Sequence, residues 1–381
     1  MNKETRTCKY RRKCGACQTL NLSYEEELSL KMKREIDLLG RFGHVQEIIP
    51  SSPSDHYRNK AQYLFHFNHG RMITGLYRSS DGKIAEIGSC LMEDRDLSQL
   101  YLQIKKLIAQ KKVRIFDGRD GDLRHIMLRK GIRTGEISVS FVTKNGLFPQ
   151  VEDIAEELMK HNPSIVCVTA VKNDTRTPLW MNGEEYLIRG RGYINDTLCG
   201  CSFRIPPKAF YQINPYSTEI LYQTASEFAQ ITATDHVLDA YCGIGTIGIT
   251  ATKGCCASLD GFDNNRDSIT IADLNARQNN ISNFSYACIT DSKCTLNKNK
   301  HYDVVFVDPP RAGVDKKFIS VLLELHANRL IYISCNPQTL SRDLNILKKN
   351  YKTVCIQPVD MFPGTTHVET AVLLRGKNDN N

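Results

Sequence analysis

The sequence predicts an α/β protein in which a doubly wound, Rossmann-like sheet follows an N-terminal, mostly antiparallel β-rich domain that carries a cysteine cluster. Three observations support this prediction: the length of 381 residues, a change of pattern near residue 200, and a group of closely spaced cysteines near the start. A chain of this length holds two or three domains of ordinary size. We therefore expect two domains, over residues 1–200 and 201–381.

The first half alternates short aromatic and β-branched runs with turn signals, as antiparallel strands do. These runs read AQYLFHF, MITGLY, GEISVSFVT, SIVCVTAV and EYLIRG. Between them, apolar residues recur with the spacing of a helix over 24–39, 97–110 and 151–160. The first half is thus expected to be rich in strands, with a few helices.

From about residue 200 onward, strand patterns alternate with helix patterns. The strand patterns include HVLDAYCG, CASLDGFD, YDVVFVDPP and RLIYISCN, each followed by a helical stretch. Two more apolar runs, KTVCIQPVD and VETAVLLR, come last. Strands separated by helices of this length predict a mostly parallel, doubly wound sheet.

Composition excludes several classes of protein. Hydrophobic residues make up 41% and charged residues 24% of the chain, which argues against a disordered chain, a collagen or a coiled-coil rod. The sequence has no apolar run of about 18 residues that could span a membrane, and its basic start lacks the apolar stretch of a secretory signal. We expect a cytoplasmic monomer without membrane association. The net charge of +8 suits a polyanionic partner without requiring one.

A glycine-rich turn, LDAYCGIGTIG, ends the first strand of the second half and is typical of a site for a nucleotide-like ligand. Gly243 and Gly245 allow a ligand to approach the backbone, and with Gly248 they also satisfy the dinucleotide fingerprint of dehydrogenases. Asp263 ends the next strand, where a carboxylate accepts hydrogen bonds from a ribose. Dinucleotides and S-adenosylmethionine share that ribose, so both cofactors stay open, as does a helix-capping role for Asp263.

The strand YDVVFV ends in Asp308, followed by two prolines and an arginine. Two prolines make a stiff elbow at the carboxyl edge of the sheet, where ligands bind. This elbow resembles the (N/D)PP motif of S-adenosylmethionine-dependent methyltransferases that modify bases, which dehydrogenases lack. Asp308 is then available to hydrogen-bond the methyl donor or a flipped base.

Two further residues are candidates for covalent and acid–base chemistry. Cys335 follows the strand LIYIS at the same edge, where a cysteine is placed as a nucleophile, whereas a structural cysteine would sit within a strand. Glu369 enters the last strand and is able to act as a base in the same pocket. The alternative interpretation of Glu369 is an ordinary solvated glutamate.

Together these motifs resemble those of the RNA (uracil-5-)-methyltransferases. The resemblance rests on FYQINP, LDAYCGIGTIG, DPPRAG, SCNPQTLSRD and DMFPGTTHVET, which cover nearly all of residues 203–376, and on CxxxxxCGxCQ and YRNKAQY before them. It implies that Cys335 adds to C6 of uracil, that C5 then takes the methyl group of S-adenosylmethionine, and that Glu369 removes the C5 proton.

The resemblance also implies which residues line the pocket for S-adenosylmethionine and uracil. Thr246 stands where many members carry Asn, and Asp263 where many carry Glu, and both replacements keep a polar side chain. Asp291 is a candidate contact to the adenine, with a turn-forming role as its alternative. The expected cofactor-binding residues are Gln212, Tyr241, Gly243, Thr246, Asp263, Asp291 and Asp308.

Fourteen cysteines are present, and four of them form a pattern. Cys8, Cys14 and Cys17 stand close together and Cys90 follows at a distance, which in a chain without a signal favours a metal or cluster site. These ligands alone leave zinc and iron–sulfur open, and unrelated thiols near a terminus are the alternative. Some members of the family bind a [4Fe–4S] cluster with this spacing, so the resemblance implies one here.

RNA is the expected partner. Basic and aromatic residues mix over 58–78, and residues 105–133 hold ten Lys or Arg against three Asp, as suits phosphate contacts and base stacking. Aromatic residues in the core of a sheet would explain the first segment equally well. Many relatives begin with a TRAM domain, a small RNA-binding barrel, which we expect to be absent here because Cys8 comes so early. The cluster favours 23S rRNA as substrate, and the T-loop uridine of tRNA is the alternative.

Three other functions compete with RNA uracil methylation. A non-catalytic iron–sulfur or zinc RNA-binding protein would be expected to lose one of Cys335, Glu369 and Asp308. A cytosine-C5 methyltransferase also uses a cysteine but lacks the SCNPQT and HVET segments. A nicotinamide dehydrogenase rests on the glycine fingerprint alone.

Overall fold

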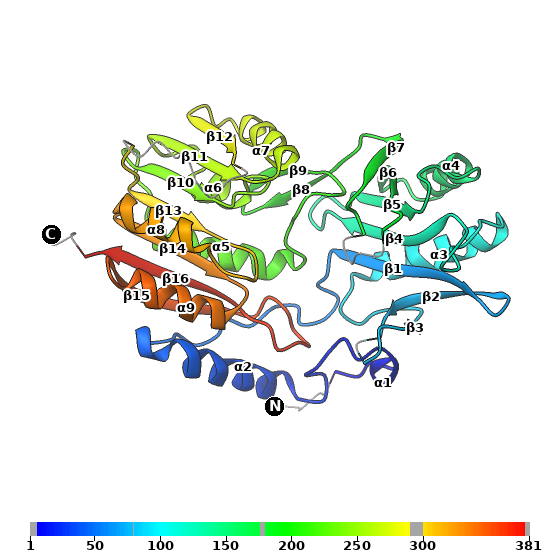
Figure 1. Ribbon diagram of the computed structural model, residues 1–381, viewed down its shortest axis with the longest axis horizontal. Helices are drawn as coiled ribbons and strands as arrows, with labels where there is room; N and C mark the ends of the chain where they lie inside the picture. Colours follow the sequence, from blue (N-terminus) through cyan, green and yellow to red (C-terminus); the bar gives the residue numbers. More distant parts are fainter. Residues whose placement is uncertain (1–5, 79, 176–179, 290–299, 378–381) are drawn as a thin grey trace. The chain divides into compact units, whose positions relative to one another are not determined.

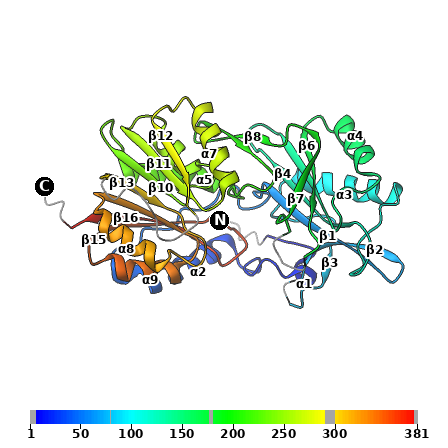
Figure 2. The same ribbon diagram turned by 45° about the horizontal axis from the view of Figure 1, so that its top comes forward.

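The computed structural model describes residues 6–78, 80–175, 180–289 and 300–377, which fall into two compact units (Figures 1 and 2). The first unit comprises Met1–Asn21, Pro53–Thr197 and Arg204–Ala209, and the second Leu22–Ser52, Leu198–Phe203 and Phe210–Asn381. The segment Leu22–Ser52 therefore groups with the C-terminal half of the chain. The domain boundary that we predicted at residue 200 remains a prediction.

The first unit contains a seven-stranded sheet in the order β3-β2-β1-β4-β5-β6-β7. All neighbouring strands are antiparallel except β5 and β6, which are parallel. This agrees with the mostly antiparallel, β-rich first half that the sequence predicts. The strands are β1 (Lys60–Asn68), β2 (Arg71–Tyr77), β3 (Ile84–Glu86), β4 (Leu123–Lys130), β5 (Ile137–Thr143), β6 (Ile165–Lys172) and β7 (Glu184–Gly190).

Helices α3 (Arg95–Gln110) and α4 (Val151–His161) contact each other and pack on this sheet, and the short α1 (Arg11–Cys14) contacts β3. They confirm the helices predicted over 97–110 and 151–160. Helix α3 buries a stripe at helical spacing that includes Leu97, Tyr101 and Ile104. The ring of Tyr101 stacks on that of Tyr63 in β1 at 3.6 Å, so helix and sheet share one core.

The second unit contains the predicted doubly wound sheet, in the order β12-β11-β10-β13-β14-β16-β15. The first five strands are parallel, and β16 runs antiparallel to β14 and β15. The strand order reverses between β10 and β13, where ligands of such sheets bind. The strands are β10 (His236–Ala240), β11 (Ser258–Asp263), β12 (Phe284–Cys288), β13 (Val304–Val307), β14 (Arg329–Ser334), β15 (Tyr351–Val359) and β16 (Glu369–Gly376).

Helix α2 confirms the helix predicted over 24–39 and begins at a capping box formed by Ser23 and Glu26. Although it comes early in the chain, α2 contacts α9 and β15, and Figure 1 shows it beside them. None of the described helices is both long and apolar enough to cross a membrane.

The helices of this unit are α2 (Tyr24–Leu39), the 3₁₀ helix η1 (Gly40–Phe42), α5 (Pro215–Ala229), α6 (Thr246–Thr252), α7 (Arg266–Gln278), α8 (Lys316–Leu325) and α9 (Pro337–Leu347). The paired strands β8 (Ile194–Leu198) and β9 (Cys201–Ile205) lie where the chain passes between the units.

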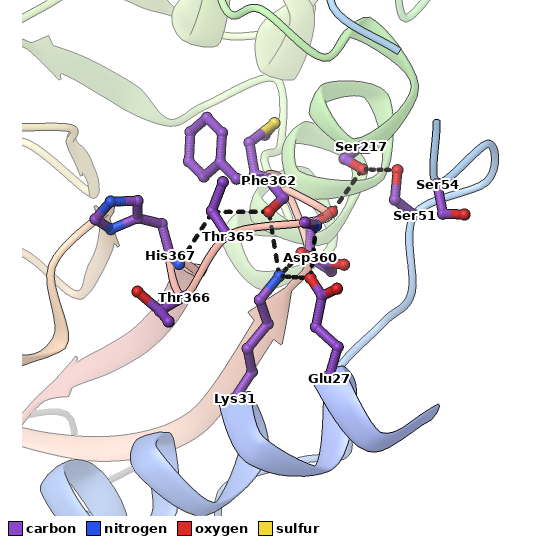
Figure 3. Close-up of polar contacts among 12 residues, drawn as sticks. Glu27, Lys31, Ser51, Ser54, Ser217, Asp360, Phe362, Thr365, Thr366 and His367 are labelled. Atoms are coloured by element: carbon purple, nitrogen blue, oxygen red, sulfur yellow. Dashed lines mark hydrogen bonds and ion pairs between the residues drawn. The ribbon is translucent and has the colours of Figure 1, made fainter. Parts of the chain in front are cut away.

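Helix α2 buries a stripe of charged residues instead of apolar ones. Glu27, Lys31 and Glu35, spaced by four residues, are each at most 1% exposed. The Lys31 ammonium lies 2.6 Å from Glu27 Oε1 and 2.7 Å from Asp360 Oδ1, and it also donates to the carbonyl of Phe362 (Figure 3). One buried cation therefore holds two buried carboxylates, one of which lies just beyond β15.

The segment after Asp360 is held by further hydrogen bonds to this network. The backbone N–H of Gly364 donates to Glu27 Oε1 at 2.8 Å, and the hydroxyl of Tyr24 donates to Asp360 Oδ2 at 2.8 Å. From α5, the Ser217 hydroxyl donates to the Asp360 carbonyl at 2.9 Å (Figure 3). Helices α2 and α5 thus fasten residues 360–368, the segment that leads directly into β16.

We predict that Lys31→Met destabilises the second unit by about 3–5 kcal/mol, because it leaves two buried carboxylates without a cation. The matched control is Arg277→Met, which removes an i,i+4 ion pair with Asp273 on the exposed face of α7 and should change stability far less. Urea unfolding followed by circular dichroism measures both. Equal effects of the two substitutions would contradict this account of the network.

Candidate active site

The turn after β10 is shaped by three residues with positive φ. Gly243 and Gly245 have φ of 54° and 83°, and Tyr241, which is not a glycine, has φ of 62°. A left-handed conformation at a bulky residue costs about 1–3 kcal/mol and persists where the surroundings enforce it. Here the Tyr241 ring packs on Phe318 at 5.6 Å and on Phe262 at 6.0 Å. The chain thus accepts strain at the predicted cofactor turn.

The third glycine of the fingerprint has a packing role. The N–H of Gly248 donates to Asp239 Oδ2 at 2.8 Å, and a Cβ at this position would meet that oxygen at 2.9 Å. Burial raises the pKa of Asp239 to about 7, and its Oδ1 atom has no partner among the described residues. The Gly248 N–H is therefore a needed partner for a buried carboxyl.

Asp263, at the end of β11, reaches back to the same turn. Its Oδ2 accepts from the N–H of Gly243 at 3.1 Å, and its Oδ1 accepts from the N–H of Asn265 at 2.8 Å. Helix α7 is capped by Asn265, which accepts from Asp267 and Ser268, so the helix-capping interpretation of Asp263 is wrong. Each oxygen of Asp263 keeps a lone pair that a ribose hydroxyl is able to use.

Thr246 and Gln212 come from different elements of the second unit. The hydroxyls of Thr246 and Tyr222 lie 3.1 Å apart, which connects the first turn of α6 to α5. Gln212 is 7% exposed and stands just before Asn214, the residue that caps α5. The side chain of Asn214 also donates to the Met361 carbonyl at 3.0 Å, so the FYQINP motif is anchored on the segment that leads to β16.

Cys335 lies between the end of β14 and the start of α9. The cap of that helix, Asn336, accepts from Gln338, and Ser334 Oγ hydrogen-bonds both the N–H and the carbonyl of Asn336. Cys335 is half-buried, and burial raises the pKa of its thiol to about 11; Glu369 and then Asp308 raise it too, while Arg311 lowers it. The thiol therefore faces two carboxyls and one guanidinium.

The loop that carries Arg311 is fastened to α9. The carbonyl of Arg311 accepts from Asn336 Nδ2 at 3.1 Å and from Thr339 Oγ1 at 3.3 Å. Gly313 has φ of 78°, and a Cβ there would lie 2.5 Å from the Arg342 guanidinium, so only glycine fits. Arg342 in turn donates to the carbonyl of Ala312 at 3.0 Å. The DPPRAG and SCNPQT motifs are thus two halves of one structure.

Glu369 stands opposite Cys335 across two antiparallel strands. Ser334 pairs with Thr370 in the register of β14 and β16, so the residues just beyond them, Cys335 and Glu369, meet at the same sheet edge. Glu369 is 3% exposed and its Oε2 has no partner among the described residues. Burial raises its pKa well above the usual value, with Asp308 adding to this, and burial raises the pKa of Asp308 to about 7.

The geometry thus gathers Cys335, Glu369, Asp308 and Arg311 at the carboxyl edge of the sheet, beside the switch point. A thiol next to a helix N-terminus and a cation is suited to nucleophilic addition, and a desolvated carboxylate is suited to proton removal. Asp291, predicted to contact an adenine, lies outside the described residues.

The four patterned cysteines lie in the first unit and influence one another electrostatically. Burial raises the pKa of Cys14 and of Cys17, with Cys8 adding to both, and it raises the pKa of Cys90 to about 12, with Cys17 adding. These influences connect Cys8, Cys14 and Cys17 with one another, and Cys17 with Cys90. Within the described part of the chain, however, no three His, Cys, Asp or Glu side chains stand in an arrangement that could hold a metal ion.

The segments predicted to contact RNA are less free than their composition suggests. Over 58–78, Tyr63 and Phe65 are buried in the sheet, whereas Phe67 and Tyr77 are 43% and 47% exposed. Several basic side chains form ion pairs with carboxylates: Lys111 with Asp153 and Glu157, Arg114 with Asp120, Lys130 with Asp94 and Asp96, Arg71 with Glu86, and Arg78 with Asp81. The local positive charge is therefore partly neutralised.

Sequence reasoning missed two charged residues of the site. Arg311 stands within the DPPRAG motif with nothing in the sequence to distinguish it, yet it is the cation beside Cys335. Glu35 was missed because it lies far before the motifs in the sequence, although the spacing of four residues from Glu27 to Lys31 and from Lys31 to Glu35 was a visible signal.

Comparison with known proteins agrees with this geometry. Residues 23–377 match the family described as tRNA (uracil-5-)-methyltransferase. Proteins named uncharacterized RNA methyltransferase are similar: one from Clostridium tetani is 34% identical, covering 96% of this chain and 82% of the relative, and one from Staphylococcus aureus is 35% identical, covering 99% and 85%. The crystal structure of Pyrococcus abyssi tRNA (uracil-54, C5)-methyltransferase in complex with S-adenosyl-L-homocysteine has a TM-score of 0.79 and 27% identity, covering 98% of this chain and 88% of that one.

Fold and site together define an RNA methyltransferase. More particularly, because the family model spans most of the chain, the protein belongs to the tRNA (uracil-5-)-methyltransferase family. The resemblance predicted from the sequence motifs is confirmed at this level.

We predict opposite effects of two substitutions on the alkylation of Cys335 by iodoacetamide at about pH 8. Below the thiol pKa the rate follows the thiolate fraction, and one pKa unit changes that fraction about tenfold. Arg311→Gln removes the cation that lowers the Cys335 pKa, so alkylation should slow severalfold; Asp308→Asn removes an anion that raises it, so alkylation should quicken. Peptide mass spectrometry measures the rates, with the exposed Cys255 as the internal reference. Changes in the same direction would refute the proposed electrostatics.

Proposed function

We propose that this protein is an S-adenosylmethionine-dependent methyltransferase that forms 5-methyluridine in RNA, with 23S rRNA as its substrate. The observation that carries the proposal is the meeting of Cys335 and Glu369 at one edge of the sheet, beside Asp308. Family membership supports the reaction class.

Cys335 is proposed as the nucleophile. C5 of uracil is a poor nucleophile until a thiolate adds to C6 and places electron density on C5, which then attacks the methyl group of the donor. Arg311 and the N-terminus of α9 favour the thiolate, offsetting the burial that raises the pKa of Cys335 to about 11. The target base must leave its stack to reach the thiol.

Glu369 is proposed as the base that completes the reaction. It takes the C5 proton, the C5–C6 double bond re-forms, and the thiolate of Cys335 leaves. A carboxylate that burial makes reluctant to ionise is a stronger base than a solvated one, which suits removal of a carbon-bound proton.

The cofactor would bind at the glycine-rich turn and the switch point of the sheet. The turn offers close backbone approach and Asp263 offers oxygens for the ribose hydroxyls. The complex of the Pyrococcus abyssi protein with S-adenosyl-L-homocysteine supports the choice of methyl donor. The residues proposed to contact it are Gln212, Tyr241, Gly243, Thr246, Asp263 and Asp308, with Asp291 as a further candidate.

A tRNA uridine is the second candidate substrate. The similar Pyrococcus abyssi structure is named a tRNA (uracil-54, C5)-methyltransferase, and the family description names tRNA as well. The cysteine pattern is the feature that favours rRNA.

Nucleoside mass spectrometry tests reaction and substrate together. The protein is incubated with labelled S-adenosylmethionine and either unmodified 23S rRNA or an unmodified tRNA pool, and we expect label in 5-methyluridine from the rRNA. Label in 5-methyluridine from the tRNA pool alone would show that tRNA and not rRNA is the substrate. Label in neither pool would refute the proposed function.

Two substitutions separate the chemical roles in the same assay. Cys335→Ala should abolish methylation, whereas Glu369→Gln should leave a covalent protein–RNA adduct, because the C5 proton is not removed. Glu227→Gln, an exposed glutamate on α5, is the matched control and should behave as the wild type. Full turnover by either active-site variant would exclude this mechanism.

Cys8, Cys14, Cys17 and Cys90 are proposed to hold a [4Fe–4S] cluster, which would tie the N-terminal segment to the first unit and supply no step of the methyl transfer. Anaerobically purified protein should be brown and contain about four irons per chain. Cys14→Ser should lose the iron, whereas Cys255→Ser, at an exposed cysteine, should keep it. A colourless protein that contains zinc would overturn the cluster.

A further inference from the structure

Glu35 is a buried carboxyl that forms no ion pair with any of the residues that the structure describes. It is 0% exposed, and the hydroxyl of Thr370 donates to its Oε2 at 2.8 Å. Its second oxygen, Oε1, has no hydrogen-bond partner among the described residues. Burying an unpaired charge is costly enough that such groups usually serve a purpose or give up their charge. Burial indeed raises the pKa of Glu35 to about 7.

The neighbouring cations on α2 are already committed. Lys31, one turn before Glu35, uses its ammonium on Glu27, Asp360 and the carbonyl of Phe362. The guanidinium of Arg34 lowers the pKa of Glu35, but its two terminal nitrogens donate to the Thr366 carbonyl at 3.0 Å and to Gln338 Oε1 at 3.1 Å. Neither side chain makes an ion pair with Glu35.

Glu35 instead lies against the start of β16. Thr370, which it binds, directly follows Glu369, and the charge of Glu35 raises the pKa of Glu369. Glu369 also keeps one buried oxygen without a partner, Oε2. The other charged groups that face Glu369 are Asp308, which raises its pKa, and Arg311, which lowers it. Burial and Asp308 raise the pKa of Glu369 most, and Glu35 adds to them from the side of Thr370.

We propose that Glu35 is a positioning residue for the C5 proton abstraction: it holds the start of β16 through Thr370 and, through its charge, makes Glu369 a stronger base. This inference rests on the proposed function. When Glu369 takes the C5 proton, the C5–H electron pair re-forms the C5–C6 double bond, the C6–S bond breaks and the thiolate of Cys335 leaves. Glu369 is then neutral, so its repulsion with Glu35 is relieved at the moment of proton transfer.

The role predicts a specific pH dependence. Proton removal needs ionised Glu369, so its rate falls as pH drops through the pKa of that group. In Glu35→Gln the neighbouring charge is gone and the pKa of Glu369 falls, so the acid limb of the pH profile should move to lower pH. The base is also weaker, so above that limb proton loss should be about threefold slower than in the wild type. The two profiles should therefore cross.

The experiment counts two events on one RNA that carries tritium at C5 of uridine, with a carbon-labelled methyl donor. Methyl transfer is read from label on RNA or on the protein–RNA adduct, and proton removal from tritium released to water. Glu35→Gln should transfer methyl groups at nearly the wild-type rate but release tritium more slowly at the plateau, so the adduct accumulates. Glu35→Asp, which keeps the charge, should restore most of the release. Thr370→Val keeps the Glu35 carboxyl but removes the hydrogen bond that lowers its pKa, so it should move the acid limb in the same direction as Glu35→Gln and by less.

The outcomes separate this inference from the function it rests on. If the wild type methylates RNA but Glu35→Gln slows both events equally with an unmoved acid limb, Glu35 has only a structural role and the inference fails. If the wild type neither methylates RNA nor releases tritium, the proposed function itself fails. If Glu35→Gln does not fold, Glu35→Asp provides the test. Its shorter side chain moves the charge away from Glu369, so its ratio of tritium release to methyl transfer should be measurably lower than that of the wild type.

Discussion

The buried ion pairs of Lys31 are the interaction on which the rest of the active site depends. An ammonium and two carboxylates removed from water stabilise the fold only when they hold one another at close range, so their positions tolerate little movement. Asp360 and the Gly364 N–H are both tied into this network. The segment between β15 and β16 is thereby fixed to α2, and with it the point at which Glu369 enters the sheet.

Exclusion of water also sets the pKa values on which the chemistry of the site depends. Asp308, Glu369 and Glu35 are carboxyls whose pKa values burial raises, and Arg311 counters the negative charge near Cys335. In water these groups would be weak bases and largely independent of one another. Inside the second unit their charges act on one another more strongly, which suits the successive roles that we propose for a thiol and a carboxyl.

Much of the fold follows from local pattern. The helical spacing over 24–39 predicted α2 at its observed ends, and the strand–helix alternation after residue 200 predicted the doubly wound sheet. The pattern could not predict that 22–52 packs with the C-terminal half, because periodicity reports which face of an element is apolar and not which sheet covers it. The pattern also predicted an apolar buried face for α2, whereas the stripe that α2 buries is charged.

The sequence by itself determined the family, the glycine-rich turn and the ends of the strands at which Cys335, Asp308 and Glu369 stand. These are local properties, since a residue at the end of a parallel strand or at the start of an antiparallel one reaches the same edge in any sheet of this topology. Only the tertiary structure decided that Arg311 faces the thiol of Cys335. It also decided that Lys31 forms ion pairs with Glu27 and Asp360, and that Glu35 lies near Glu369. Burial and electrostatic interactions depend on distances in space, and only folding brings these residues, which are far apart in the sequence, into one buried site.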